Sequence, residues 1–558
     1  MSDPPEFPPT RSLPRVKPQF GIWPTLRGAK VSRDGWYFRA LGVVIAAIPP
    51  LAVLALLDRM DLAVYTMAGS MAALFTHTQP YRHRAASMAG FVAMLTLACG
   101  VSMAAAATSG NMLWRIGVAV LLAAIIKVAH DASTVGPPPA VIPIFLVTAL
   151  AFTPQHWGDI PMHLALIAGS GVVAWIVVMA PALVRPHGPE RRAVATAMLA
   201  TIPVGKDPHS AAARDSLAGA ITAAWRVLSL SRTRTPEQAA LEAHLIACSR
   251  ILAEPQLSNP ERARQNAHEV ERSRTALPAP PLTEDEQAEI RGMHLEQDAR
   301  RGFADRHPIL AAFRPSSPSM PFFWRVFVGC LAAALVSYAL GADRPFWAIV
   351  SAAVIIQPNL LLTWRKAPPR ALGAVLGVGL FALLAPVAHI DPVIAAAMVL
   401  ALNAVTELFI ARNYLIAQLF VTPMALLMSQ FGAPLPSGEL IVERVIDTVI
   451  GVVMALAAAF LIRNGHLRRH AKAATERLEQ ASEVGLPADA SPAEVERVRR
   501  ELVARLAAVA AAVRDSDSEW WTHRVDETRV IAAQRRARAV LASLGDDPGD
   551  TRRTSTSG

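Results

Sequence analysis

The sequence predicts an all-α polytopic membrane protein with two repeated six-helix transmembrane halves and helical cytoplasmic domains. Hydrophobic residues make up 53% of the 558 positions and charged residues only 18%, whereas soluble proteins average about 25% charged residues. The apolar residues gather in two clusters, 37–184 and 321–462, which contain runs of about 18 residues or more, long enough to cross a bilayer. Polar segments with the periodicity of amphipathic helices follow each cluster.

Each cluster divides into six apolar runs at short stretches of Pro, Gly or charged residues. In the first half we expect spans at 37–57, 61–77, 85–107, 112–129, 138–154 and 161–184. In the second half we expect spans at 322–341, 345–363, 369–388, 391–410, 413–431 and 440–462. Residues 1–36 lack the apolar core and cleavage site of a secretory signal, so we expect them to form a cytoplasmic N-terminal segment.

Lys and Arg are concentrated in alternate connections, the distribution that the positive-inside rule gives to cytoplasmic loops. On one side lie Arg27, Lys30, Arg33, Arg82, Arg84, Lys127, Arg185, Arg191, Arg192, Arg365, Lys366, Arg370, Arg412, Arg463, Arg468 and Arg469. The opposite connections carry almost no excess of positive charge. Both termini and the middle segment are therefore predicted to lie in the cytoplasm. Arg365 is expected in the loop before the ninth span, and Arg370 at the start of that span.

The two clusters also resemble each other in sequence. WYFR at 36–39 opens the first and FFWR at 322–325 opens the second. Their arginines, Arg39 and Arg325, are 286 positions apart, and Arg84 and Arg370 are separated by the same interval. Because each half has an even number of spans, such a duplication would produce parallel repeats, with a substrate site between them as the default expectation.

The polar segments 185–320 and 463–558 contain apolar residues at helical spacing. We expect the first to form a helical cytoplasmic domain and the second to form another, ending in a disordered tail. The two follow equivalent sixth spans and could pack on each other.

Motifs for catalysis and cofactor binding are absent from the sequence, which contains no GxxxxGK[ST], HExxH or GxSxG. Cys99, Cys248 and Cys330 are scattered without a CxxC, so neither a disulfide nor a metal site is expected. The net charge is +10, and many nucleic-acid-binding proteins are basic. The distribution of the positive charge over alternate loops favours a topological role instead. We therefore expect no enzyme activity, no cofactor and no nucleic-acid partner.

Ionisable residues occur inside the apolar spans, where they are costly and usually mark a functional pathway or a buried pair. Arg444, Asp447 and Gly451 share one face of the twelfth span. An intrahelical ion pair that makes this span insertable and a role in proton coupling are equally compatible with that spacing. In the ninth span, Arg370 precedes Gly373 and Gly377, whose spacing favours close helix packing.

Two further polar positions lie in the tenth and eleventh spans. Glu407 is near the cytoplasmic end of the tenth span, about one turn from Arg412. Thr422 and Pro423 should fall near the middle of the membrane, where the proline removes one backbone donor and leaves a polar spot.

Three stretches of the second half, FWAIVSAAVIIQPNLLLTWRKAPPRALGAVLG, RNYLIAQLFVTPMALL and ERVIDTVIGVVMAL, resemble the fusaric acid resistance family, which includes the aromatic acid exporters. The layout of spans and cytoplasmic segments is similar too. The resemblance implies an inner-membrane efflux protein for aromatic or other weak organic acids, often working with a periplasmic adaptor (membrane fusion) protein. It covers Gln357, Pro358, Arg365, Arg370, Gly373, Tyr414, Thr422, Pro423, Arg444, Asp447 and Gly451. The first half departs from it, with Ser87 in the place of Gly373 and no acid in the place of Asp447.

The resemblance suggests a role for the basic residues beyond topology, because a vestibule lined by one sign of charge concentrates the opposite one. Expected substrate and vestibule residues are Arg39, Arg84, Arg325, Gln357, Arg365, Arg370, Tyr414 and Thr422. Expected proton-coupling residues are Asp447, Arg444 and Glu407, and expected packing residues are Gly373, Gly377 and Gly451. A purely topological role for the arginines stays an equal alternative.

The leading interpretation is an exporter (antiporter) of small organic anions in the bacterial inner membrane, coupled to the proton gradient. Its expected partners are membrane lipids, with a periplasmic adaptor and a homo-oligomer as further candidates. The alternatives are an organic-anion channel and a membrane scaffold that transports nothing.

Overall fold

The computed structural model describes most of the two apolar clusters and part of the polar segments. Described are residue 26; residues 35–272 except 134, 137–139, 209 and 232–234; residues 278–290 except 285, 288 and 289; residues 307–462 except 316, 318 and 433–435; residues 465–483; and part of 491–540. The predicted N-terminal segment lies almost wholly outside these residues, and the predicted C-terminal tail lies outside them entirely.

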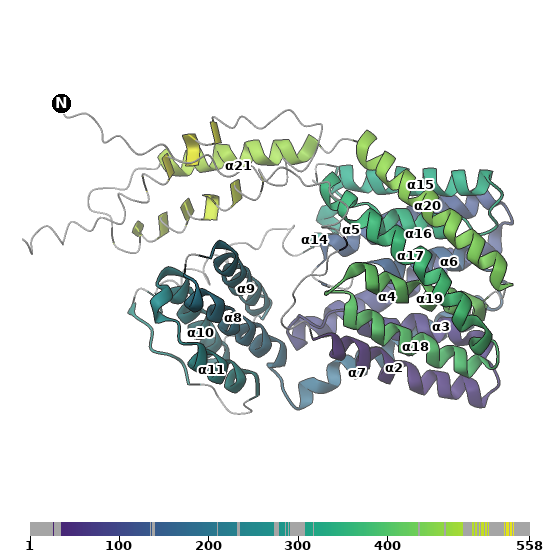
Figure 1. The fold of residues 1–558 in the computed structure, drawn as a ribbon, viewed down its shortest axis with the longest axis horizontal. Helices are drawn as coiled ribbons and strands as arrows, with labels where there is room; N and C mark the ends of the chain where they lie inside the picture. The colour runs from purple at the N-terminus through teal and green to yellow at the C-terminus, as the bar shows by residue number, and fades with distance from the viewer. Residues whose placement is uncertain are drawn as a thin grey trace, which may run out of the picture.

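The described part is all-helical, as predicted, and its apolar helices form one bundle (Figure 1). The first half contains α2 (Trp36–Leu56), η1 (Met60–Leu62), α3 (Ala63–Ser70), η2 (Met71–Leu74), α4 (Tyr81–Thr108), α5 (Met112–Ala132), α6 (Val141–Phe152), α7 (Ile160–Met179) and η3 (Ala180–Leu183). The second half contains α15 (Met320–Ala339), α16 (Phe346–Ile355), α17 (Leu360–Ala388), α18 (Pro392–Phe409), α19 (Tyr414–Gly432) and α20 (Ser437–Leu461), and is preceded by α14 (Pro308–Ala312).

Three of the twelve predicted spans correspond to helices shorter than predicted. Among the described residues, nine helices are long and apolar enough to cross a membrane, whereas Met60–Leu74, Val141–Phe152 and Phe346–Ile355 are shorter. The ten residues of α16 rise only about 15 Å, half of the hydrocarbon thickness. All ten are buried. Helix α16 is surrounded by protein, so its residues are apolar on every side of the helix. A helix that crosses lipid has the same apolar sequence pattern.

A second correction concerns the charged stretch before the predicted ninth span. Helix α17 begins at Leu360, capped by the Asn359 side chain, and continues through Pro368 and Pro369. Arg365 therefore lies on the exposed surface of this helix and not in a loop. At 29 residues the helix rises about 44 Å, so its basic first turns can extend beyond the hydrocarbon core, which is about 30 Å thick.

The ends of two short helices are held by buried arginines. After α16 the chain is extended, and Arg325 donates to the carbonyl oxygens of Pro358 at 3.0 Å and Ile462 at 2.7 Å. After η2, Arg84 donates to the carbonyl oxygens of His77 at 2.7 Å and Gln79 at 2.9 Å. Irregular backbone at membrane depth must find its hydrogen bonds inside the protein, and these guanidinium groups provide them.

The same pairs of helices contact each other in both halves. Contacts of α2 with α7, α3 with α7 and α4 with α6 have counterparts in α15 with α20, α16 with α20 and α17 with α19. The halves meet through α2 against α18 and α5 against α15, and through α6 against α16. This arrangement is compatible with a duplication, which itself remains a prediction.

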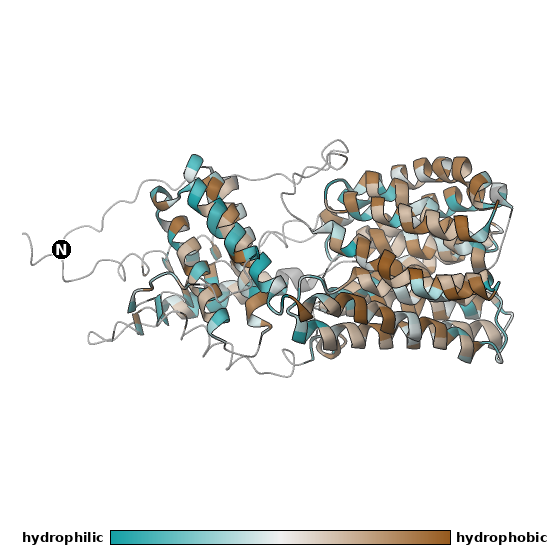
Figure 2. Ribbon diagram, turned by 90° about the horizontal axis from the view of Figure 1, so that it is seen from below, coloured by the Kyte–Doolittle hydropathy of each residue, from teal (hydrophilic) through white to brown (hydrophobic). Residues whose placement is uncertain are grey.

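The polar helices lie at one end of the bundle (Figure 1). They comprise α8 (Gly188–Lys206), α9 (Ala211–Ser229), α10 (Pro236–Ala253), η4 (Pro255–Leu257), α11 (Pro260–Arg272) and, separately, α21 (Gly465–Glu483). Helix α8 packs against α9, α10 and α11 around a small apolar core of their own. These helices alternate hydrophilic and hydrophobic surface, whereas the bundle is hydrophobic over most of its length (Figure 2).

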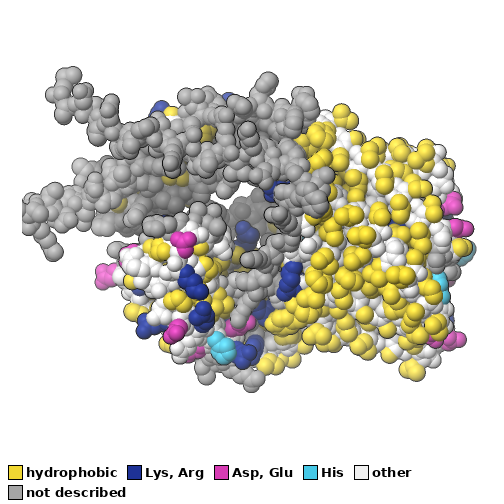
Figure 3. Space-filling view, viewed as in Figure 1, with side chains coloured by type: hydrophobic (Ala, Val, Ile, Leu, Met, Phe, Trp, Pro, Cys, Tyr) yellow, Lys and Arg dark blue, Asp and Glu magenta, His cyan; other side chains and the backbone are white. Residues whose placement is uncertain are grey.

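Charge is distributed unequally between the two ends of the bundle. Hydrophobic side chains cover most of its visible face, Lys and Arg gather where the polar helices begin, and Asp, Glu and His gather at the opposite end (Figure 3). The end that carries the polar helices is thus the more basic one.

Glycines bring α17 and α19 into close contact. A Cβ atom on Gly377 would lie 2.7 Å from the Thr422 Cβ and 2.8 Å from the Leu419 carbonyl oxygen. A Cβ atom on Gly373 would meet Gln418 and Leu415 at similar distances. Small residues at such positions let transmembrane helices approach closely.

Gly377→Ala should therefore lower the thermal stability of the detergent-solubilised protein, at a cost of about 1–3 kcal/mol, typical of overpacking. Gly379 lies two residues along the same helix, and a Cβ atom added there would have no atom within 4 Å. Gly379→Ala is therefore the matched control and should not lower stability. Equal melting temperatures for the two variants would contradict the packing argument.

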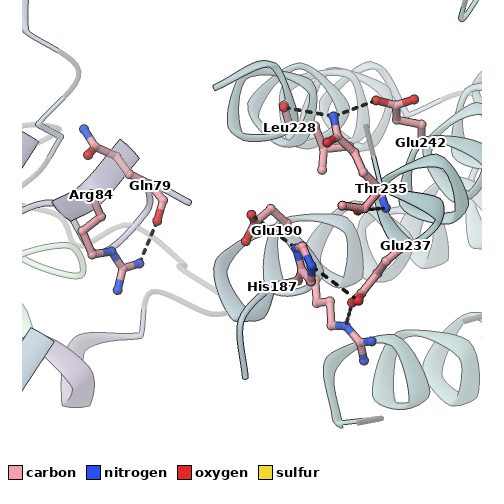
Figure 4. Close-up of polar contacts among 10 residues, drawn as sticks. Gln79, Arg84, His187, Glu190, Leu228, Thr235, Glu237 and Glu242 are labelled. Carbon is pink, nitrogen blue, oxygen red and sulfur yellow. Dashed lines mark hydrogen bonds and ion pairs between the residues drawn. The ribbon is translucent and has the colours of Figure 1, made fainter. Parts of the chain in front are cut away.

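A cluster of charged side chains stabilises the start of the polar domain. Arg191 donates to Glu237 at 2.5 Å, while the ring of His187 lies 3.8 Å from Glu190 and 3.6 Å from Glu237 (Figure 4). Glu190 raises the pKa of His187; burial opposes this, and Glu237 adds to the rise. The protonated ring is thus favoured in the folded protein.

Because this pKa is raised on folding, the stabilisation is complete below the ordinary His pKa of about 6.5 and is lost as pH rises through the higher folded value. We expect His187→Gln to lower the melting temperature at mildly acidic pH and to have little effect at alkaline pH. Melting curves of both proteins across this range test this, and a difference independent of pH would contradict it.

Candidate functional site

A pocket lies between the two halves of the bundle. Helix α6 of the first half and helices α16 to α20 of the second half contribute to its lining. The lining residues are Val141, Ile142, Phe145, Trp347, Val350, Val354, Arg370, Asn403, Thr406, Glu407, Ile410, Tyr414, Gln418, Val421, Met424, Ala425 and Arg444. An apolar lining with a few polar groups is typical of a small-molecule site.

Two arginines bring positive charge into this pocket. Arg370 projects from α17 and Arg444 from α20, and each is only 1% exposed. Within the described part of the chain, neither guanidinium lies within ion-pair distance of a carboxylate. Arg370 donates to the side-chain oxygen of Gln418, and the Arg444 Cζ lies 4.2 Å from the ring centroid of Trp347. Buried charges are normally paired, so two such cations indicate a site for an anion.

The hydrogen-bonding atoms support the same conclusion. Arg370 Nε and both Arg444 Nε and Nη1 are buried without a hydrogen-bond partner among the described residues. The same holds for Trp347 Nε1, Asn403 Nδ2, Thr406 Oγ1 and Tyr414 Oη. A buried donor without an acceptor costs about 1–3 kcal/mol. The lining thus has an excess of donors, which a carboxylate, as an acceptor-only group, can satisfy.

The one acidic side chain of the lining is held by a residue of the other half. The Arg39 Nε donates to the Glu407 Oε2 at 2.5 Å, and both side chains are buried. Arg39 belongs to α2 and Glu407 to α18, so this ion pair joins the two halves. It also balances the negative charge of Glu407, which leaves Arg370 and Arg444 to set the sign of the pocket.

The walls are apolar and partly aromatic. Phe145 stacks on Trp347 with ring centroids 5.4 Å apart and an interplanar angle of 21°. Val350, Val354 and Met424 line other parts of the pocket. A flat apolar group attached to the bound anion would contact these walls and gain from the removal of its surface from water.

Asp447 lies one turn from Arg444 but faces another helix. The Ser337 Oγ of α15 donates to its Oδ1 at 2.6 Å, and its Oδ2 has no hydrogen-bond partner in the structure. The ion pair considered between Arg444 and Asp447 is not formed within the described residues. Positions three apart differ by about 60° around a helix, enough to direct Arg444 toward α16 and Asp447 toward α15.

The other predicted site residues lie outside the pocket lining. Arg39 pairs with Glu407, while Arg84 and Arg325 hold backbone carbonyls as described above. Gln357 donates its amide to the Val354 and Ile356 carbonyl oxygens at 3.1 and 2.8 Å.

Two predicted residues, Thr422 and Gly451, make helix contacts. The Thr422 hydroxyl donates to the Gln418 carbonyl oxygen at 3.0 Å. A Cβ atom on Gly451 would lie 2.8 Å from the Ala348 carbonyl oxygen. Arg370, Tyr414, Arg444 and Glu407 are the predicted residues that the structure brings together in the pocket.

Among the lining residues that sequence reasoning missed are Asn403, Gln418, Trp347 and Phe145. Asn403 and Gln418 are uncharged polar residues within apolar spans, a signal that was available but weaker than charge. For the two aromatic residues no sequence signal distinguishes a pocket wall from a lipid-facing or core position.

Comparison with known proteins agrees with the second-half resemblance. Residues 331–458 match the fusaric acid resistance protein-like family. This segment contains most of the pocket, including Arg370, Tyr414 and Arg444.

A similar curated protein is an uncharacterized protein from Synechocystis, 26% identical over 212 residues that cover 36% of this chain. The chain covers 28% of that relative's length. No solved structure matches the chain. The match and the apolar helices together suggest a multi-pass membrane transporter.

Proposed function

We propose that the protein exports small organic anions, aromatic carboxylates among them, from the cytoplasm across the bacterial inner membrane. The observation that carries the proposal is the pocket between the halves, where Arg370 and Arg444 are buried without a carboxylate partner among the described residues. The carboxylate of the substrate would accept hydrogen bonds from these guanidinium groups. Its ring would lie against Phe145 and Trp347.

The proposed orientation places the polar helices in the cytoplasm. The basic end of the bundle, next to these helices, supports it under the positive-inside rule. The family resemblance adds a periplasmic adaptor protein as a candidate partner at the opposite end, and a homo-oligomer is a further candidate.

Replacing Arg370 tests the anion site. Arg370→Gln should weaken binding of benzoate to the purified protein by about 10- to 100-fold, because hydrogen bonds to charged groups contribute about 1.5–3 kcal/mol. Isothermal titration calorimetry measures this. Arg365→Gln is the matched control, since Arg365 lies exposed on the same helix, and should bind as the wild type does.

The stability of the same variants gives an independent readout. A buried cation without a carboxylate partner is costly, so Arg370→Gln should melt no lower than Arg365→Gln in the absence of benzoate. If the two variants bind benzoate with equal affinity, the proposed anion-binding role of the arginines is wrong and only their topological role is left.

We further propose that Asp447 couples export to the proton gradient. The carboxyl group is buried, accepts from Ser337 and is one helical turn from a pocket arginine, so its protonation would alter the electrostatic potential at Arg444. A coupling group needs such a connection between a proton site and the substrate site.

Asp447→Asn should therefore abolish accumulation of benzenesulfonate driven by a pH gradient in proteoliposomes, while downhill flux and benzoate binding persist. Benzenesulfonate stays ionised and crosses lipid poorly, so the flux reports on the protein. Glu439→Gln, at the exposed start of the same helix, is the control and should keep uphill transport. Normal pH-driven accumulation by Asp447→Asn would refute the coupling role, and wild-type flux that never runs uphill would favour a channel.

A further inference from the structure

A second cavity lies next to the first. Parts of α3, α6 and α19 and the residues around the start of α16 form it. Its lining residues are Val64, Ala68, Phe145, Leu146, Ala149, Leu150, Phe152, Thr153, Arg344, Phe346 and Ser429. Like the first pocket, it is mostly apolar and contains a cation, Arg344.

Three helices show that the two cavities follow each other along the bundle. On α6 the first pocket is lined by residues 141–145 and the second cavity by residues from 145 to 153. On α19 the first pocket extends from Tyr414 to Ala425, and the second cavity is reached at Ser429. On α16 the first pocket ends at Trp347, and the second cavity begins at Phe346.

The chain direction shows which end of the bundle the second cavity approaches. Ser429 is near the end of α19, where the chain turns into α20, and α20 then runs back to the end that carries α21. The second cavity is therefore nearer to the end opposite the polar helices.

Phe145 is the residue that lines both cavities. Its ring stacks on Trp347 at 5.4 Å and lies 6.3 Å from Phe346. The rings of Phe346 and Trp347 are 4.5 Å apart, and Phe152 lies 6.0 Å from Phe346. An aromatic cluster thus lies where the two cavities adjoin. Phe346 contacts the other three rings, and Phe145 is the member that lines both cavities.

We propose that the second cavity is an exit subsite for the same organic anion, and that the Phe145 side chain is the gate between the two cavities. The inference rests on the proposed export function. Arg344 would attract the anion after it leaves Arg370 and Arg444. Turning the Phe145 ring changes side-chain rotamers only, and such changes are fast compared with domain motions.

Arg444 provides a connection between the substrate and this gate. Its guanidinium lies over the ring of Trp347, and Trp347 stacks on Phe145. A carboxylate that binds Arg444 competes with the contact between this cation and the ring. Occupation of the first pocket would therefore loosen the aromatic cluster on the side where the anion has to leave.

Flux through proteoliposomes that contain the full chain tests the gate, with benzenesulfonate as the probe. Phe145→Ala should raise downhill flux in the absence of a pH gradient several-fold and abolish uphill accumulation, because the passage no longer closes. Phe327→Ala removes an equal side chain from α15, which lines neither cavity, and it should keep the wild-type downhill flux.

Two further variants keep the test decisive if Phe145→Ala does not fold. Phe145→Trp should slow transport several-fold, because the larger ring obstructs the way from the first pocket to the second cavity. Arg344→Gln should likewise lower the transport rate, because the second cavity loses its cation. Wild-type flux in Phe145→Trp would overturn the gate.

The outcomes separate this inference from the function on which it rests. If the wild type binds benzoate and transports benzenesulfonate, and the Phe145 variants behave as the wild type does, the gate is wrong and the exporter stands. If the wild type neither binds nor transports these anions, the proposed function fails, and the gate fails with it.

Discussion

The structure depends on how buried polar groups find hydrogen-bond partners inside the bundle, where water is not available to them. Backbone that leaves a helix at membrane depth needs partners within the protein. Arg84 and Arg325 provide them by donating to carbonyl oxygens after η2 and α16. With these ends held, helices that are too short to cross a bilayer can stay inside the bundle. The short helices α6 and α16 then form the walls of both cavities.

By the same rule, the pocket differs from the rest of the bundle in the partners of its buried arginines. Arg39, Arg84 and Arg325 are buried, and each has a carboxylate or carbonyl partner. Arg370 and Arg444 are buried as deeply, yet among the described residues neither has a carboxylate or backbone carbonyl partner. Three of their donor atoms have no acceptor there, as against one donor atom, the Nε, of Arg84. A protein that keeps such costly groups needs a use for them, and an anion that binds in the pocket provides one.

The two halves use equivalent sequence positions differently. Arg84 and Arg370 are 286 positions apart in sequence, but the first holds backbone carbonyls and the second lines the pocket. The first half contributes α6 to the pocket and, through Arg39, the partner of Glu407. Its role at this site is therefore to close the pocket and balance its charge, while the second half provides the cations.

The sequence by itself determined the helical class, the membrane location and the two clusters, because apolar composition and helix length follow directly from the hydrocarbon solvent. It also indicated Arg370, Glu407 and Arg444 through their charge within apolar spans, and Tyr414 through the family resemblance. It could not show that α16 is a short buried helix, since protein and lipid surroundings select the same apolar residues. Only the tertiary structure decided which arginines are paired. A guanidinium group can reach a carbonyl or a carboxylate hundreds of residues away, as Arg39 reaches Glu407, and that contact depends on helix packing and not on local sequence.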